Sequence, residues 1–181
     1  VETRVGHSFI KAVMASEGAV FGGEHSAHYY FRDFFNADTG MLAAMHVLAA
    51  LGTQDQPLSE LAAEYNPYFA SGEINSEVAD KAAAVDRVLE AFATGWAEGG
   101  RADGGSAVTC EACLDEEGLS GVEVTVRTLD GTTVSAADGS WWFNLRPSNT
   151  EPFLRYNGEA KDVATMERVR DAVLALVRQG S

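Results

Sequence analysis

Seven consecutive residues, Arg146 to Pro152, combine side chains that donate hydrogen bonds to anions with residues that form tight turns. An arginine fork, two hydroxyls, an amide and the N–H groups of a tight turn form a donor-rich concavity that suits phosphate. Two prolines stiffen the segment and lower the cost of ordering it around a ligand. Ser, Asn, Thr and Pro also favour ordinary turns, so these residues by themselves fit an anion-binding loop or a structural turn. The donors are Arg146, Ser148, Asn149 and Thr150.

A second polar loop, residues 22–30, follows the short apolar run 19–21 and offers groups that bind sugar hydroxyls. A strand that runs into a glycine-opened polar loop is a common place for ligands in α/β proteins. Glu24 and Ser26 lie two residues apart, so an extended backbone would point both to one side, together with His28. A surface loop with incidental histidines is the alternative for this segment.

Residues 1–66 alternate between segments predicted as helices and strands. Asp38 is the expected N-cap of a helix that ends near Leu51, and Pro57 opens another short helix. The first of these two helices should turn a stripe of apolar residues inward: Met41, Leu42, Met45, Leu48 and Ala49. The remaining predicted elements are a helix over 7–17, a buried strand over 19–21 and a strand over 28–31. These are too few strands for a complete α/β domain, so the region fits the trailing part of an α/β domain with a mixed sheet.

Asn66-Pro67 breaks the pattern and marks the expected junction with a second domain, residues 67–181. Alternating valines over 122–126 predict a strand with one wet face, and Asp130-Gly131 and Asp138-Gly139 predict turns. Aromatic-rich strands are also expected on both sides of the anion-binding loop. Two helical stripes complete the domain: Val78, Ala82, Val85, Leu89 and Phe92, then Val163, Met166, Arg170, Val173 and Val177. The pattern predicts an α+β domain, an antiparallel sheet with helices on one face.

The chain is acidic, with 13 Lys and Arg against 27 Asp and Glu and a net charge of −14. This charge speaks against nucleic acid and membranes as partners, and no apolar run approaches the ~20 residues needed to cross a bilayer. A phosphate site therefore has to be a local basic patch. Basic residues do gather around the two loops: Arg4, His7, Lys11, His28 and Arg32 near the first, Arg146 and Arg155 near the second.

Cysteine usage is sparse, with Cys110 and Cys113 in a Cys-x-x-Cys spacing. A structural zinc site needs about four ligands, and no second pair of suitable spacing accompanies these two. A thioredoxin-type context is also missing, so ordinary thiols are favoured over a metal or redox site. Two cysteines in an acidic chain without a recognisable leader fit the cytoplasm.

Taken together, the loops resemble those of the α-D-phosphohexomutases, the family of phosphomannomutases and phosphoglucomutases. Gly23 to His28 is similar to the sugar-recognition loop Gly-Glu-x-Ser-Gly-His, and Arg146 to Pro152 to the phosphate-binding loop Arg-x-Ser-Asn-Thr-Glu-Pro. Val5 to Lys11 resembles a third segment, a Gly-His turn that opens a helix. Asn149 favours the mannose and glucose mutases over the glucosamine mutases, which usually carry glycine there. One departure is Ala27, where the family often has glycine, because a methyl group restricts the backbone.

The resemblance implies interconversion of mannose 1-phosphate and mannose 6-phosphate, with glucose phosphates as further substrates, through a hexose 1,6-bisphosphate. It implies that Glu24 and Ser26 bind the ring hydroxyls and that His7 and His28 orient the substrate or transfer protons. A donor role for the two histidines in place of proton transfer remains open. The residues implied to hold the phosphate are Arg146, Ser148, Asn149 and Thr150, with Arg155 in support.

The resemblance covers only the end of the family's third domain, residues 1–66, and its fourth domain, residues 67–181. The family's phosphorylated serine and its aspartate-rich magnesium loop have no counterpart in this sequence. We therefore expect no metal ligands here, Mg²⁺ held by N-terminal domains that are missing from this chain, and no catalysis by the chain alone. The alternatives are a phosphoglucosamine mutase and a sugar-phosphate-binding module without chemistry.

Overall fold

The computed structural model describes residues 1–93, 106–109, 122–148 and 150–179. The chain divides into two compact units, Val1–Asn66 and Pro67–Ser181. Within the described ranges, no helix is both long and apolar enough to span a bilayer. The combination of α/β and antiparallel α+β structure expected from the sequence is confirmed.

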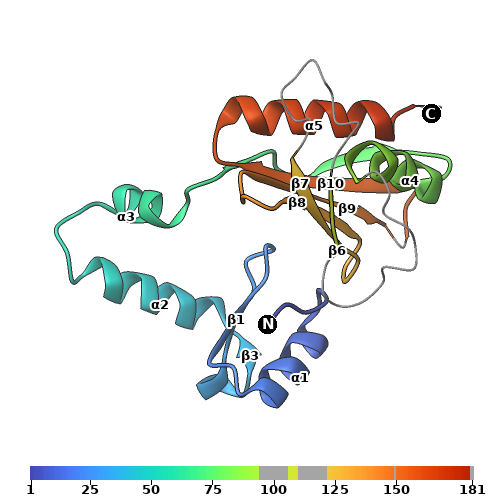
Figure 1. Cartoon of the computed structure of the whole chain (residues 1–181). Helices are drawn as coiled ribbons and strands as arrows, with labels where there is room; N and C mark the ends of the chain where they lie inside the picture. Colours follow the sequence, from blue (N-terminus) through green and yellow to red (C-terminus); the bar gives the residue numbers. More distant parts are fainter. Residues whose placement is uncertain (94–105, 110–121, 149, 180–181) are drawn as a thin grey trace. The chain divides into compact units, whose positions relative to one another are not determined.

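The first unit contains a small antiparallel sheet with α1 beside it, and α2 and α3 follow later in the chain (Figure 1). Its strands follow one another in the order β1-β2-β3. Three residues form its buried core, Ile10 and Met14 from the first helix and Tyr30 from the central strand. The elements are α1 His7–Glu17, β1 Phe21–Gly23, β2 Tyr29–Phe31, a short 3-10 turn Arg32–Phe34, β3 Ala37–Asp38, α2 Gly40–Leu51 and α3 Leu58–Tyr65.

Three local predictions for this unit were wrong. The first strand covers residues 21–23, and it is not buried, since half of Phe21 is exposed. Thr39, not Asp38, caps α2, because Asp38 pairs with Tyr30 in the sheet while the Thr39 hydroxyl accepts a hydrogen bond from the Leu42 N–H at 3.3 Å. The apolar stripe of α2 does not face a core: no residue of this helix is buried in the described structure, and Met41 is 75% exposed.

The second unit is a seven-stranded antiparallel sheet whose main path runs β4-β10-β9-β8-β7-β6, with β5 paired to β10. Figure 1 shows both helices of this unit on the same side of the sheet. The elements are β4 Phe69–Ala70, β5 Ile74–Glu77, α4 Lys81–Phe92, β6 Ser106–Thr109, β7 Glu123–Arg127, β8 Thr132–Ala136, β9 Trp141–Pro147, β10 Phe153–Ala160 and α5 Val163–Val177.

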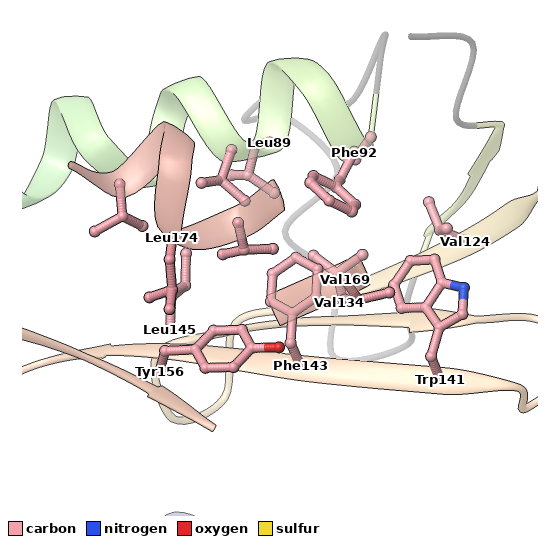
Figure 2. Close-up of a cluster of buried hydrophobic side chains, with 14 of the residues drawn as sticks. Leu89, Phe92, Val124, Val134, Trp141, Phe143, Leu145, Tyr156, Val169 and Leu174 are labelled. Atoms are coloured by element: carbon pink, nitrogen blue, oxygen red, sulfur yellow. The ribbon is translucent and has the colours of Figure 1, made fainter. Parts of the chain in front are cut away.

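Strict alternation along β9 and β10 gives this sheet one buried and one open face. Figure 2 shows the rings of the buried face between sheet and helices, where Phe92 meets Phe143 edge-to-face at 5.2 Å between ring centroids. Trp141 and Tyr156 both stack against Phe143. Arg146 and Arg155 alternate with these buried residues, so they belong to the face of the sheet opposite the helices.

The strand over 122–126, both turns and the final helix are confirmed in this unit. The stripe predicted for the preceding helix is partly wrong, because Val78 lies before α4 and Ala82 is exposed. The helix begins after Asp80, whose carboxylate accepts a hydrogen bond from the Ala83 N–H at 3.0 Å, and this start sets a different buried face. The buried residues of α4 are Ala84, Val88, Leu89 and Phe92.

Candidate functional site

The anion-binding loop connects β9 and β10, which pair in register from Pro147 opposite Leu154. Its ends close through a hydrogen bond from the Ser148 N–H to the Phe153 carbonyl at 2.9 Å. The Ser148 hydroxyl oxygen accepts from the N–H groups of Thr150 at 3.4 Å and Glu151 at 3.2 Å. Ser148 is 9% exposed and thus organises the loop from inside, while its hydroxyl proton remains a donor. Asn149 lies outside the described residues.

The segment between β5 and α4 supports this loop from outside. The Val78 N–H donates to the Pro152 carbonyl at 3.1 Å. The ammonium of Lys81, the first residue of α4, donates to the carbonyls of Ser148 at 2.7 Å and Glu151 at 2.9 Å. Sequence reasoning missed Lys81, because nothing in its local pattern links it to a loop that follows 67 residues later.

Arg146 and Arg155 stand directly opposite each other on neighbouring strands, so their side chains share one face. Two like charges in this position repel, and carboxylates compensate them. Arg155 pairs with Glu151 at 3.3 Å and with Glu73 at 3.6 Å. The side chains of both arginines remain about a third exposed, at 33% for Arg146 and 29% for Arg155. An arriving phosphate can therefore reach both guanidinium groups in competition with these acids.

The partner of Arg146 is Asp130, whose carboxylate lies 3.7 Å from the guanidinium. The tight β7–β8 turn holds Asp130 there, and the Asn144 amide donates to its carbonyl at 2.9 Å. Gly131 follows with φ +74°, and a Cβ at that position would lie 2.5 Å from the Leu145 carbonyl oxygen. Only glycine fits this close approach without displacing the backbone of β9. The glycine therefore helps to fix the strand that carries Arg146.

The second polar loop joins β1 and β2, and its backbone is a turn rather than the extended segment expected. The Glu24 N–H donates to the His28 carbonyl at 2.9 Å, and the Ala27 N–H donates to the Glu24 carbonyl at 3.0 Å. Ala27 adopts the left-handed conformation with φ 64°, a conformation that favours glycine. The sequence predicted that Glu24, Ser26 and His28 point to one side because the backbone is extended. That reason is wrong, because the chain bends between Glu24 and His28.

The turn nevertheless brings two predicted residues together. The Ser26 hydroxyl lies 2.9 Å from Nδ1 of His28, a distance that fixes the orientation of the imidazole. Both residues are exposed. His7, the third predicted polar residue of this unit, stands exposed at the start of α1, after Gly6.

Glu24 is held by a residue that sequence reasoning did not single out. The hydroxyl of Tyr30, which is fully buried, donates to Oε1 of Glu24. Burial raises the pKa of Tyr30 well above its ordinary value, and the hydrogen bond to the Glu24 carboxylate raises it further. Tyr30 therefore stays protonated and remains a donor at physiological pH. The available signal was its place in the strand, since alternate residues of a half-buried strand point inward.

Comparison with known families identifies both units of the chain. Residues 1–68 match the sequence model of the phosphoglucomutase/phosphomannomutase alpha/beta/alpha domain III, and residues 73–176 match that of the C-terminal domain. The chain belongs to the phosphoglucomutase/phosphomannomutase family. The resemblance seen in the loop motifs is therefore confirmed over nearly the whole chain.

Individual relatives agree with this membership. A phosphomannomutase of Salmonella typhimurium is 40% identical over 181 residues, which are 99% of this chain and 33% of that protein. A phosphomannomutase of Methanocaldococcus jannaschii is 34% identical over 98% of this chain and 32% of its own length. A crystal structure of a phosphoglucomutase/phosphomannomutase family protein from Burkholderia thailandensis superposes with a TM-score of 0.65 at 26% identity, covering 99% of this chain and 33% of that one. The chain spans about a third of the length of these relatives.

The magnesium ion that the family resemblance implies has no set of ligands among the described residues of this chain. No group of three His, Cys, Asp or Glu side chains gathers there in a way that could hold a metal ion. The single carboxylate of the anion-binding loop, that of Glu151, is instead engaged with Arg155. Cys110 and Cys113 lie outside the described residues.

Proposed function

We propose that this chain is the substrate-binding, C-terminal part of a phosphomannomutase that interconverts mannose 1-phosphate and mannose 6-phosphate and also accepts glucose phosphates. The observation that best supports this role is the β9–β10 hairpin with its opposed pair Arg146 and Arg155. Two partly exposed guanidinium groups beside a loop braced on two sides form a preorganised anion site, which binds phosphate at a low ordering cost. The family membership of both units makes a sugar phosphate the fitting anion.

In this proposal the hairpin holds the phosphate that is not being transferred. The guanidinium of Arg146 supplies the main charge-assisted hydrogen bonds, and Arg155 supports it. Thr150 is exposed and donates from its hydroxyl, and Asn149 adds an amide. Ser148 contributes mainly by shaping the loop, because its oxygen already accepts two backbone N–H groups.

The β1–β2 loop recognises the sugar in this proposal. The Glu24 carboxylate, aligned by Tyr30, accepts hydrogen bonds from ring hydroxyls, and Ser26 adds a hydroxyl. His28, oriented through Nδ1 by Ser26, and His7 orient the substrate or accept the proton of the hydroxyl that is phosphorylated. The β1–β2 loop thereby recognises hydroxyls, whereas the β9–β10 hairpin recognises phosphate.

The reaction itself requires groups from the rest of the relatives' polypeptide. A phosphoserine there would transfer its phosphoryl group to the free O1 or O6 hydroxyl, whose proton passes to a base, and so form hexose 1,6-bisphosphate. After the bisphosphate rebinds in the reversed orientation, its other phosphoryl group returns to the serine. Mg²⁺, held outside this chain, would neutralise charge on the transferred phosphoryl group. The described residues of this chain bind and orient, and we expect no turnover from the 181 residues alone.

Amide-resolved NMR of the ¹⁵N-labelled chain tests the assignment of the two loops. Inorganic phosphate should shift amides of 146–155 only, whereas mannose 1-phosphate should also shift amides of 24–30. Phosphate shifts that avoid the hairpin would contradict the anchor, and identical shift patterns for the two ligands would contradict the division of roles. Mutase turnover by the isolated chain would refute the view that it lacks the catalytic groups. Glucosamine 1-phosphate, used as a third ligand, checks the alternative of a phosphoglucosamine mutase.

A further inference from the structure

The anion-binding loop is braced by a residue far away in sequence. Lys81 donates two of its three ammonium hydrogens to the carbonyls of Ser148 and Glu151, at 2.7 and 2.9 Å. These carbonyls belong to opposite ends of the loop, so one side chain ties both ends together. The neighbouring Val78 N–H adds a third bond, to the Pro152 carbonyl at 3.1 Å. Three hydrogen bonds thus connect residues 78–81 with the loop.

The position of Lys81 is itself fixed by the fold. The preceding residue, Asp80, caps the helix through the Ala83 N–H at 3.0 Å, so α4 begins at Lys81. The helix then packs onto the sheet through a buried face that includes Ala84 and Val88. On the other side, β5 is paired with β10, which places Glu77 opposite Phe153 at the end of the loop. Lys81 therefore reaches the loop from a rigid support.

Carbonyl orientation decides whether such a loop accepts an anion. A carbonyl oxygen carries the negative end of the peptide dipole and repels phosphate, whereas N–H groups attract it. Two carbonyls bonded to an ammonium are directed toward that ammonium and are not free to turn toward the ligand. The lysine also places a positive charge against a loop that carries the Glu151 carboxylate.

We propose that Lys81 is a positioning residue of the phosphate site, which acts on the anion through the two loop carbonyls that it holds. This inference rests on the proposed function of the hairpin as a phosphate anchor. It adds a specific cause for the loop's shape that the loop sequence does not contain. Lys81 is not a catalytic residue in this scheme, because it reaches the ligand only through the loop.

Affinity for inorganic phosphate and for mannose 1-phosphate, measured by NMR titration of the intact 181-residue chain, tests the inference. Lys81→Met keeps the helix propensity and the aliphatic stem while removing the donors. Loss of two hydrogen bonds from the loop should weaken both ligands roughly 5- to 50-fold. Lys81→Arg, which can donate to both carbonyls, should recover most of the affinity. Amide hydrogen exchange at Thr150 and Glu151 should accelerate in Lys81→Met, because the loop is released.

Lys161→Met is the matched control. Its ammonium also donates to a turn carbonyl, that of Asp138 at 3.2 Å, but this turn joins β8 and β9 at the other end of β9. The control should leave phosphate affinity unchanged within about twofold. We call the two hydrogen bonds from Lys81 to the loop carbonyls the clamp. Repeating the titrations in 0.5 M salt distinguishes the effect of the clamp from a long-range charge effect, since salt screens distant charges. If Lys81→Met loses phosphate affinity at low salt but not at high salt, the clamp is overturned. A phosphate affinity of Lys81→Met equal to that of the original chain would also overturn it.

Arg146→Ala distinguishes failure of this inference from failure of the proposed function. If Arg146→Ala weakens phosphate binding and Lys81→Met does not, only the clamp is wrong. If neither change affects phosphate affinity, the hairpin is not the anchor and both proposals fail. Should Lys81→Met not fold, Lys81→Gln provides the same comparison, because glutamine is also a good helix former and its shorter amide cannot tie both carbonyls. Wild-type-like affinity in a folded Lys81→Gln variant would then overturn the clamp.

Discussion

The two units of the chain support their loops in different ways. The hairpin that carries Arg146 belongs to a sheet covered by two helices, and its large buried side chains form one continuous cluster. The loop that carries Glu24 belongs to a three-stranded sheet whose buried core contains only Ile10, Met14 and Tyr30 in the described structure. The hairpin that carries the anion-binding loop is thus anchored on a packed sheet, whereas the β1–β2 loop is held mainly by a few hydrogen bonds.

The exposed apolar surface follows the same division. The helix α2 is strongly apolar yet has no buried residue, and Leu48 on it is 65% exposed. Exposed apolar surface of this kind marks an interface. In the described structure α2 thus buries no residue, whereas both helices of the second unit bury one face against their sheet.

Replacing a buried ring should expose the difference in stability most strongly. Phe143→Ala in the second unit removes a fully buried ring that contacts three other aromatic rings, and should cost roughly 3–5 kcal/mol of unfolding free energy. Phe35→Ala in the first unit deletes the same group from a side chain that is 83% exposed, and should change stability by about 0.5 kcal/mol or less. Urea denaturation monitored by NMR amides of each unit measures both. A comparable loss from Phe35→Ala would contradict the described exposure.

Arg146→Ala should produce the next largest effect, on binding instead of folding. Loss of one or two charge-assisted hydrogen bonds should weaken sugar-phosphate binding by roughly 2–4 kcal/mol, about 30- to 1000-fold. Arg170→Ala is the matched control, since Arg170 is a half-buried arginine paired with Asp171 at 2.7 Å, but on α5. Titration calorimetry with mannose 1-phosphate compares the two variants. Equal losses would show that general positive charge, and not the hairpin, attracts the ligand.

Tyr30→Phe tests the comparison of the two units at the β1–β2 loop. The substitution keeps the buried ring and removes the donor to Glu24, so Glu24 loses its alignment at a cost of about 1–2 kcal/mol in sugar binding. Inorganic phosphate affinity should not change, because the hairpin belongs to the other unit. Tyr29→Phe, at a neighbouring side chain that is 38% exposed, serves as the control. NMR titrations with mannose 1-phosphate and phosphate give the ratio, and a parallel loss for both ligands would argue against separate roles.

Sequence alone predicted the parts of the fold that local signals determine. Valine alternation identified β7, Asp130-Gly131 identified its turn, and the polar heptad between aromatic runs identified the β9–β10 hairpin. Each of these signals is contained in a few neighbouring residues. Arg146 was named from the heptad and Arg155 from its place close behind it, and only the structure places the two opposite each other on paired strands.

The features that sequence did not predict depend on distant contacts, on burial or on backbone conformation. Lys81 contacts a loop 67 residues later, and no local pattern reports that contact. Tyr30 reads as one aromatic among several, and only burial reveals it as the donor to Glu24. The apolar stripe of α2 was predicted to face inward, but no residue of this helix is buried in the described structure, because periodicity does not report what packs against a helix. Ala27 was recognised as a departure from glycine, yet its left-handed backbone became visible only in the fold.

Ala27→Gly should give the smallest effect, and it should raise the stability of the first unit, whereas the preceding changes lower stability or affinity. Ala27 holds φ 64° in a loop with few other constraints, and glycine relieves that strain, for a gain of about 0.5–1 kcal/mol in the stability of the first unit. Ala44→Gly, at an exposed site within α2 of the same unit, should instead lose about 0.5–1 kcal/mol, because helical backbone favours alanine. Urea denaturation followed at amides of residues 24–30 measures both changes. If both variants lost stability, the left-handed turn at Ala27 would not be the conformation of the β1–β2 loop in solution. The less packed unit would then hold its loop in another way.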